Sequence, residues 1–263
     1  MMDRSAQRLI GALTSPEVSQ SLRKTSILCM PVGSIEQHGP HLPLDTDILL
    51  AEAFTQAFIA RWGKTYDLWQ LPSVIPGLSR EHAWAPGTIS LSIQTMTALL
   101  RDVAGEIARS LPTRNLAFVN GHGGNRGLLE ALVRELSADF GLNVCALHLG
   151  AMMSPIAGAQ FTEIHGGKDE TSVMLAFAPE RVRRRKISGV KPPKDARMVG
   201  ALILDPAASW PWTSDDSRIA HRGITGDPRA ASAKHGRAVI DRVVESAGGL
   251  FKQLLENQRR SNR

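Results

Sequence analysis

Short apolar runs alternate along the chain with segments in which apolar residues recur at helical spacing. Continuous apolar runs predict strands buried on both faces. They lie at residues 27–32, 115–120 and 143–149, and a further apolar segment at 68–75 is broken by Pro72. Helical periodicity covers residues 48–62, 92–107, 128–140 and 232–256. Because strands and helices alternate with crossovers long enough for parallel pairing, we predict an α/β fold with three layers, α/β/α, around a mostly parallel sheet.

The second half of the chain is less regular. Residues 151–160 predict a loop of small side chains, and Glu170 opens a short predicted helix that stops at Pro179. Residues 191–225 are rich in proline, glycine and aspartate and are too long for a simple connector, so we predict a lid or an oligomer-contact segment there. We expect one domain over residues 1–263. Its ends are an N-terminal extension at 1–25, with a short helix at 5–13, and a polar tail at 257–263.

The composition is that of an ordinary globular protein, and the distribution of charge indicates which classes of partner to expect. The net charge is +6, but the excess of basic residues is concentrated at 181–186 and 259–263, where no aromatic side chains are interleaved. This pattern favours a solvated surface over a nucleic-acid-binding one. No stretch approaches about 18 consecutive apolar residues, so no membrane segment is expected. Cys29 and Cys145 lie inside apolar runs and indicate buried thiols of a reducing compartment, which predicts a cytoplasmic protein.

Three potential metal ligands follow the first predicted strand within twelve residues. They are Glu36, His38 and Asp47, separated by a loop of glycine and prolines that excludes regular helix or sheet. Asp47 stands where a helix is predicted to begin, and the carboxyl ends of strands are where open α/β sheets place their active sites. Each residue alone has a simpler explanation: Asp47 as a helix cap, for example, or Glu36 as a surface acid.

Two further motifs carry candidate chemistry. The sequence NGHGGN places His122 directly after a buried strand, and the amide groups of Gly123 and Gly124 could hold an oxyanion or a substrate phosphate. A purely structural tight turn is the alternative. His165 and Glu170 lie five residues apart across two glycines. Because Glu170 falls in the first turn of a predicted helix, its carboxylate could serve only as a partner for the helix dipole.

Together the motifs supply a mixed set of nitrogen and oxygen ligands from the ends of separate strands: Glu36, His38, Asp47, His122 and Glu170. Such a set suits Zn, Mn or Fe and offers enough donors for two divalent ions sharing one carboxylate. Two adjacent ions can deprotonate a bridging water near neutral pH and polarise a carbonyl, which predicts metal-assisted hydrolysis. The sequence contains no nucleophile-elbow serine motif or reactive-cysteine motif that would compete with this hypothesis.

In order, these motifs resemble the creatininase (creatinine amidohydrolase) family over residues 26–240. The matching segments are GSIEQHGPHLPLDTD, REHAWAPGTISL, NGHGGN, HGGKDETS and GITGDPR. The resemblance implies an α/β/α fold, a dinuclear metal centre, hydrolysis of a C–N bond in a small-molecule or short-peptide amide, and a homo-oligomer, often a hexamer. It further implies that Glu36 and His38 each bind one metal, that Asp47 bridges, and that His122 joins the metal of Glu36. His165 would be the proton shuttle.

One departure from the family bears on the substrate. Creatininase has an aromatic residue and then a metal-binding glutamate where this chain has Gly123 and Gly124. We expect Glu170 to supply the missing carboxylate, and Gly123, Gly124, Asn125 and His82 to contact substrate. The two glycines resemble a branch of formamide deformylases and mycofactocin-precursor peptidases. We therefore expect cleavage of a small cyclic amide or a formamide, with a peptidase as the alternative and a non-catalytic metal-binding relative as the rival.

Overall fold

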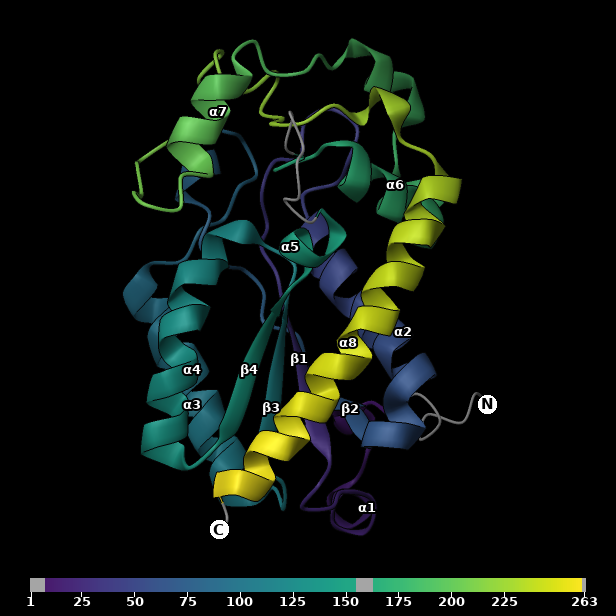
Figure 1. Ribbon diagram of the computed structural model, residues 1–263, viewed down its shortest axis with the longest axis vertical. Coiled ribbons are helices and arrows are strands. Elements are labelled where there is room, and N and C mark those ends of the chain that lie inside the picture. The colour runs from purple at the N-terminus through teal and green to yellow at the C-terminus, as the bar shows by residue number, and fades with distance from the viewer. Residues whose placement is uncertain (1–7, 155–162, 262–263) are drawn as a thin grey trace.

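The computed structural model describes residues 8–154 and 163–261, and a parallel sheet lies at its centre (Figure 1). Its strands are β1 (Ile27–Val32), β2 (Leu68–Gln70), β3 (Asn115–Asn120) and β4 (Asn143–His148). They are ordered β2-β1-β3-β4, and every neighbouring pair is parallel. The β1 and β3 strands pair over their full length, from Ile27 opposite Asn115 to Val32 opposite Asn120. The predicted parallel sheet is confirmed.

Helices cover both faces of the sheet, which confirms the three-layer prediction (Figure 1). On one face lie α3 (Ile93–Ser110) and α4 (Arg126–Phe140). On the other lie α2 (Thr46–Tyr66) and α8 (Ala233–Ser261). The remaining helices are α1 (Ser15–Ser21), α5 (Leu149–Met153), α6 (Lys168–Phe177), which packs against α8, and α7 (Ala196–Ile203). In the described part of the chain, no helix is long and apolar enough to span a membrane.

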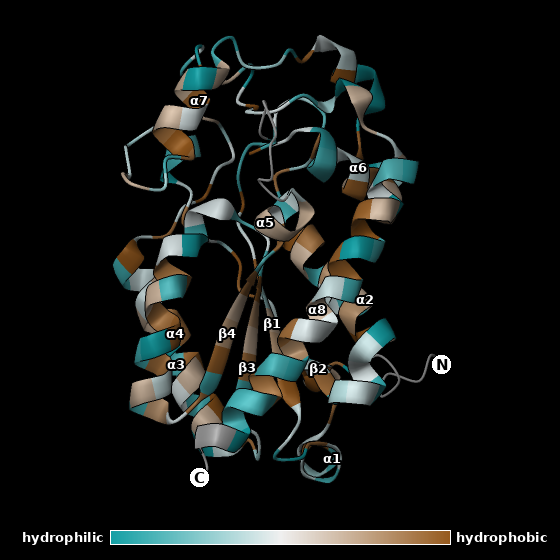
Figure 2. Cartoon of the chain, in the orientation of Figure 1, coloured by the Kyte–Doolittle hydropathy of each residue, from teal (hydrophilic) through white to brown (hydrophobic). Residues whose placement is uncertain are grey.

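Alternate residues of each strand enter two separate cores, as expected of a buried parallel strand. In β1, Ile27 and Cys29 pack with Phe54, Phe58 and Phe251 of the α2 and α8 layer. Leu28 and Met30 face the opposite core, which α3 and α4 complete. Figure 2 shows the resulting pattern, with largely apolar strands at the centre and hydrophilic residues on the outer helices. This packing fixes the carboxyl ends of β1 and β3, from which the site is built.

Three local expectations are corrected or fall outside the described residues. The apolar segment 68–75 pairs as a strand only to Gln70, because Pro72 has no amide hydrogen, and contact with β1 resumes at Val74. The helix expected at 5–13 is wrong in its described part: only a 3-10 turn, Ile10–Ala12, forms there. The unexpected α1 helix follows it. In the loop expected at 151–160, α5 covers the first residues, and 155–162 lie outside the described chain.

Candidate metal centre

The candidate ligands come together at the carboxyl ends of β1 and β3. Glu36 and His38 leave the loop that follows β1, and His122 lies two residues beyond the end of β3. Asp47 stands in the first turn of α2. All four side chains are buried. The predicted convergence of these residues is therefore present in the structure.

Asp47 lies between two histidines. Its Oδ1 is 3.1 Å from Nε2 of His38, and its Oδ2 is 3.1 Å from Nδ1 of His122. Each histidine has its other ring nitrogen close to a backbone carbonyl: His38 Nδ1 is 3.2 Å from the oxygen of Glu36, and His122 Nε2 is 2.5 Å from that of Leu78. Because a carbonyl can only accept, those nitrogens carry a proton in every state, and the nitrogens facing Asp47 are the ones that become electron-pair donors when their proton is displaced. Metal-binding histidines are commonly oriented in this way.

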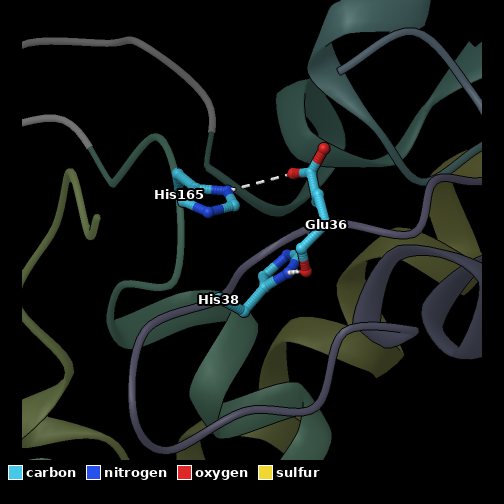
Figure 3. A group of neighbouring side chains, drawn as sticks. All are labelled: Glu36, His38 and His165. Carbon is cyan, nitrogen blue, oxygen red and sulfur yellow. Dashed lines mark hydrogen bonds and ion pairs between the residues drawn. The ribbon is translucent and has the colours of Figure 1, made fainter. Parts of the chain in front are cut away.

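The two carboxylate oxygens of Glu36 have different surroundings. The hydroxyl of Ser79 donates to its Oε2 at 2.5 Å, and His122 Nδ1 lies 3.2 Å from the same oxygen. Its Oε1 is 3.4 Å from His165 Nδ1 and 3.5 Å from His82 Nε2 but accepts no hydrogen bond. Figure 3 shows the side chain of Glu36 directed toward His165, with His38 from the same loop beside it. Ser79 was not predicted from the sequence.

The charged groups of this cluster strongly shift one another's pKa values. Burial alone would raise the pKa of Glu36, but its neighbours, His122 foremost, together outweigh burial and lower that pKa to about 2. Burial alone would lower the pKa of His38, but Asp47 raises it to about 9. The pKa of His122 is likewise raised by the carboxylates of Glu36 and Asp47 against the effect of burial. The two carboxylates therefore attract cations strongly, whether protons on the histidines or metal ions.

Two buried carboxylate oxygens without hydrogen-bond partners in the described part of the chain indicate that these residues suit a metal centre. Oε1 of Glu36 and Oδ2 of Asp47 are buried and lack a hydrogen-bond partner among the described residues, which is costly for carboxylate oxygens. Within residues 8–154 and 163–261, three groups have ligand atoms within 4.8 Å of one another: Glu36, His38 and His165; Glu36, Glu81 and His122; and His38, Asp47 and Glu170. Their nitrogen and oxygen donors suit divalent transition metals.

Two further glutamates each join a different group of candidate ligands. Glu170, in the first turn of α6, groups with His38 and Asp47, and the amide of Gly166 donates to its Oε2 at 2.6 Å. Burial raises the pKa of Glu170 to about 7. Glu81 groups with Glu36 and His122 instead, and burial also raises its pKa. Glu81 was not predicted from the sequence, where its one signal is its place beside His82 in the segment REHAW.

His165 and His82 stack on each other beside the ligands, with ring centroids 4.1 Å apart. His165 Nε2 lies 2.7 Å from the backbone oxygen of Gln37, and the side-chain nitrogen Nε2 of Gln37 is 2.9 Å from His82 Nδ1. The Ser214 hydroxyl, from the predicted lid segment, is 2.6 Å from the same His82 nitrogen. Burial lowers the pKa of His82 to about 4 and that of His165 well below its ordinary value. Both rings are therefore neutral near pH 7.

The predicted substrate residues of the NGHGGN motif occupy different surroundings. A Cβ on Gly123 would meet nothing within 4 Å, whereas one on Gly124 would lie 2.4 Å from the oxygen of Leu78. The side chain of Asn125 connects two loops, accepting from the amide of Leu78 and donating to the oxygen of Gly33, each at 2.9 Å. Substrate contact by these residues and by His82 remains a prediction.

The cluster opens into a cavity of about 340 Å³. Its walls include the candidate ligands His122 and Glu170, together with Ile203 and Trp212 from the segment predicted to be a lid. A second cavity, of about 460 Å³, shares His122, Gly123 and Glu170 with the first. The ring of Trp212 meets that of His82 edge-on at 6.0 Å. Ligand sites in proteins have volumes of this order.

An amidohydrolase family matches most of the chain, and solved members of it share the fold. A family model described as "Creatininase: Creatinine amidohydrolase" matches residues 11–250, and the chain belongs to this family of hydrolases acting on C–N bonds. The mycofactocin precursor peptide peptidase of Mycobacterium ulcerans (strain Agy99) is 33% identical over 90% of this chain and 89% of its own length. The creatinine amidohydrolase of Pseudomonas putida is 26% identical, covering 93% of this chain and 96% of its own.

A deformylase and solved structures extend the comparison. The 2-amino-5-formylamino-6-ribosylaminopyrimidin-4(3H)-one 5'-monophosphate deformylase of Methanothermobacter thermautotrophicus (strain ATCC 29096 / DSM 1053 / JCM 10044 / NBRC 100330 / Delta H) is 27% identical over 91% of this chain and 93% of its own. A crystal structure of creatinine amidohydrolase superposes with a TM-score of 0.72 at 26% identity, over 94% of this chain and 97% of that one. A structure described as "Creatininase Mn" gives 0.72 at 25% identity, over 94% and 98%. The family resemblance is confirmed.

Proposed function

We propose that this protein is a metal-dependent amidohydrolase that holds two divalent ions, Zn, Mn or Fe, and cleaves the C–N bond of a short peptide. The observation that carries the proposal is the position of Asp47, whose two buried oxygens face two different histidines. A carboxylate so placed can bridge two ions, one on the side of His38 and one on the side of His122. Bound ions of this kind polarise a carbonyl and lower the pKa of water.

The chain's own residues hold the ligands in place before any substrate arrives. Ser79 fixes one oxygen of Glu36, and the amide of Gly166 fixes one oxygen of Glu170. The backbone carbonyls that accept from His38 and His122 set the tautomer of each ring. A site whose ligands are already oriented needs little reorganisation during the reaction.

His165 is the proposed proton carrier. It lines the 340 Å³ cavity, and its Nε2 contact with the Gln37 carbonyl directs Nδ1 toward Glu36 and the reacting centre. Cleavage of an amide requires a proton on the leaving nitrogen, and a neutral histidine can take one from the attacking water and pass it on. His82, stacked against it, is the alternative carrier.

A peptide substrate is supported by the relatives and by the available space. The relatives named mycofactocin precursor peptide peptidase are 31–33% identical to this chain, above the values for the creatinine amidohydrolase and the deformylase. The second cavity offers room beyond the metal ligands for more than a ring-sized molecule. A formamide or small cyclic amide is the second candidate, supported by the likeness to the deformylase along 91% of the chain.

Hydrolysis of defined amides tests this proposal. Protein loaded with Mn²⁺ is incubated separately with a set of short peptides, with formanilide and with creatinine, and each reaction is repeated with the Glu36→Gln variant. We expect release of free amine from peptides, faster with the wild-type protein than with the variant. Turnover confined to formanilide or creatinine would support the second candidate. Wild-type rates no higher than those of the variant on every compound would reject the proposed enzymatic activity and favour a non-catalytic metal-binding protein.

A further inference from the structure

Glu81 brings a third carboxylate to the cluster. It lies in the short 3-10 turn Arg80–His82, in the loop after β2 and not in the loops after β1 and β3 that carry Glu36 and His122. Its Oε1 is 3.5 Å from Nε2 of His122. Ligand atoms of Glu81, Glu36 and His122 all lie within 4.8 Å of one another. A loop remote in sequence therefore delivers an anionic oxygen to the half of the site that contains His122.

The position of Glu81 is not explained by the other contacts of the cluster. Orientation of the His122 ring does not require it, because the oxygen of Leu78 already accepts from Nε2 at 2.5 Å. The Glu81 side chain is only 16% exposed, and His122 is its one ion-pair partner in the described chain. A largely buried carboxylate without a lysine or arginine partner is unfavourable unless a cation compensates it.

Gly124 makes room for this approach. A Cβ at that position would lie 2.7 Å from Oε1 of Glu81, 2.5 Å from Nε2 of His122 and 2.4 Å from the oxygen of Leu78. Any larger residue would have to displace the loop that carries Glu81. The neighbouring Gly123 is under no such restriction, because a Cβ there would meet nothing within 4 Å in the part of the chain that the structure describes. Only one of the two adjacent glycines is required by the packing.

We propose that Glu81 is a metal ligand, which completes a three-residue set with Glu36 and His122, and that Gly124 provides the space for it. The inference rests on the metal centre proposed above. The opposite half of the centre would then hold His38, Asp47 and Glu170. Each half would have two carboxylates and one imidazole, with Asp47 also reaching toward His122. Glu170, which the sequence predicted to supply the missing carboxylate, would belong to this opposite half.

Metal binding by Glu81→Gln tests the assignment without relying on activity. Metal-free protein is titrated with Co²⁺, and bound metal is counted by elemental analysis while the visible absorption of the ion is recorded. Glutamine keeps the size of the side chain and can still accept a hydrogen bond, but its neutral oxygen is a poor metal ligand. We expect bound Co²⁺ to fall from about two equivalents per chain toward one. The affinity of the weakened half should fall at least about tenfold, since even residues that only orient a ligand commonly cost 10–100-fold.

Two matched pairs of variants control the experiment. Glu135→Gln makes the same chemical change at an exposed position on α4 and should bind Co²⁺ like wild type. Gly124→Ala should lose the same equivalent as Glu81→Gln, whereas Gly123→Ala should keep both. Because these variants also alter packing near the site, circular dichroism is recorded for each. The Gly124 and Gly123 pair keeps the proposal testable if Glu81→Gln does not fold.

The outcomes separate this inference from the proposed function. Wild-type stoichiometry, affinity and absorption in Glu81→Gln would show that Glu81 is not a ligand while leaving the metal centre intact. Full binding by Gly124→Ala would reject the role given to the glycine. Absence of specific Co²⁺ binding by the wild-type protein would overturn the metal centre and this inference together.

Discussion

His38 contacts only one oxygen of Asp47: its Nε2 lies 3.1 Å from Oδ1, and Oδ2 on the far side has no hydrogen-bond partner although it is buried. This arrangement leaves one carboxylate available to two ions. We therefore expect Asp47→Ala to lose more metal than Glu36→Ala, because a shared ligand serves both ions and Glu36 serves mainly one. Elemental analysis of the two purified variants measures the difference. A full metal complement in Asp47→Ala would contradict the bridging role.

Removing the imidazole of His165 should impair proton transfer without impairing metal binding. We expect His165→Ala to keep nearly all of its metal while kcat falls roughly 10²–10⁴-fold, the usual contribution of a general acid–base group. His122→Ala should lose metal and activity together. Because His165 Nδ1 also lies 3.4 Å from Glu36, metal content is the decisive readout. A metal-deficient His165→Ala would make this residue a ligand. Full activity in that variant would move the proton carrier to His82.

The two tryptophans of the segment 210–212 should behave differently. Trp212 lines the cavity at the metal centre, whereas the side chain of Trp210 is 54% exposed. Loss of the indole from a substrate cavity removes apolar contact worth about 1–2 kcal/mol, so we expect Trp212→Ala to raise KM several-fold with unchanged metal content. Trp210→Ala is the matched control and should leave KM unchanged. Equal effects of the two substitutions on KM would contradict a cavity-specific role.

Trp210 has a separate predicted role. It belongs to the stretch 191–225, for which the sequence predicts a lid or a subunit contact, and its exposed ring suits a surface that another copy of the chain covers. We expect a homo-oligomer that Trp210→Ala weakens. Sedimentation at micromolar concentration measures this, and a monomeric mass for the wild-type protein would count against it.

Asp67, which lies outside the metal centre, should make the free energy of unfolding depend on pH. It accepts hydrogen bonds from Arg8, Ser26 and Trp69. Burial alone would raise the pKa of Asp67, but these bonds lower it. A carboxyl with a lowered folded-state pKa stabilises the protein above its unfolded pKa of about 3.9, and that contribution disappears as the pH falls through the folded value.

Asp67→Asn tests this coupling. Asp67 has a left-handed φ of 50°, a conformation that asparagine also tolerates, so the variant removes the charge with little backbone strain. Because the carboxylate is partly exposed, we expect a loss of only about 1 kcal/mol in unfolding free energy at neutral pH. The loss should shrink below about pH 4. Urea denaturation at both pH values measures it, and an equal loss at each would contradict the assigned cause.

The sequence predicted those parts of the site that depend on a strand and the loop leaving it. Glu36, His38 and His122 could be found because a buried apolar strand directly precedes each loop, and Asp47 because it opens a helix. Glu81 could not, because its position depends on how the loop after β2 folds back across Gly124. That contact involves residues 43 positions apart and leaves no periodic pattern in the sequence.

The same limit applies to the residues that orient the ligands. Ser79 holds Glu36 from the loop after β2, and Gln37 contacts both His82 and His165. The sequence predicted only that Glu36 and His38 would lie in the loop that follows the first strand. It carried no information about the partners they would meet, since those partners are fixed by the packing of distant loops.

The dinuclear metal centre is tested by titrating metal-free protein with Mn²⁺ while peptide hydrolysis and bound metal are measured on the same samples. We expect negligible hydrolysis without metal and a rise that levels off at about two equivalents of Mn²⁺ per chain. The Glu36→Gln variant should show no comparable rise. Full hydrolysis by the metal-free protein, or a plateau at one equivalent, would contradict a dinuclear metal-dependent amidohydrolase.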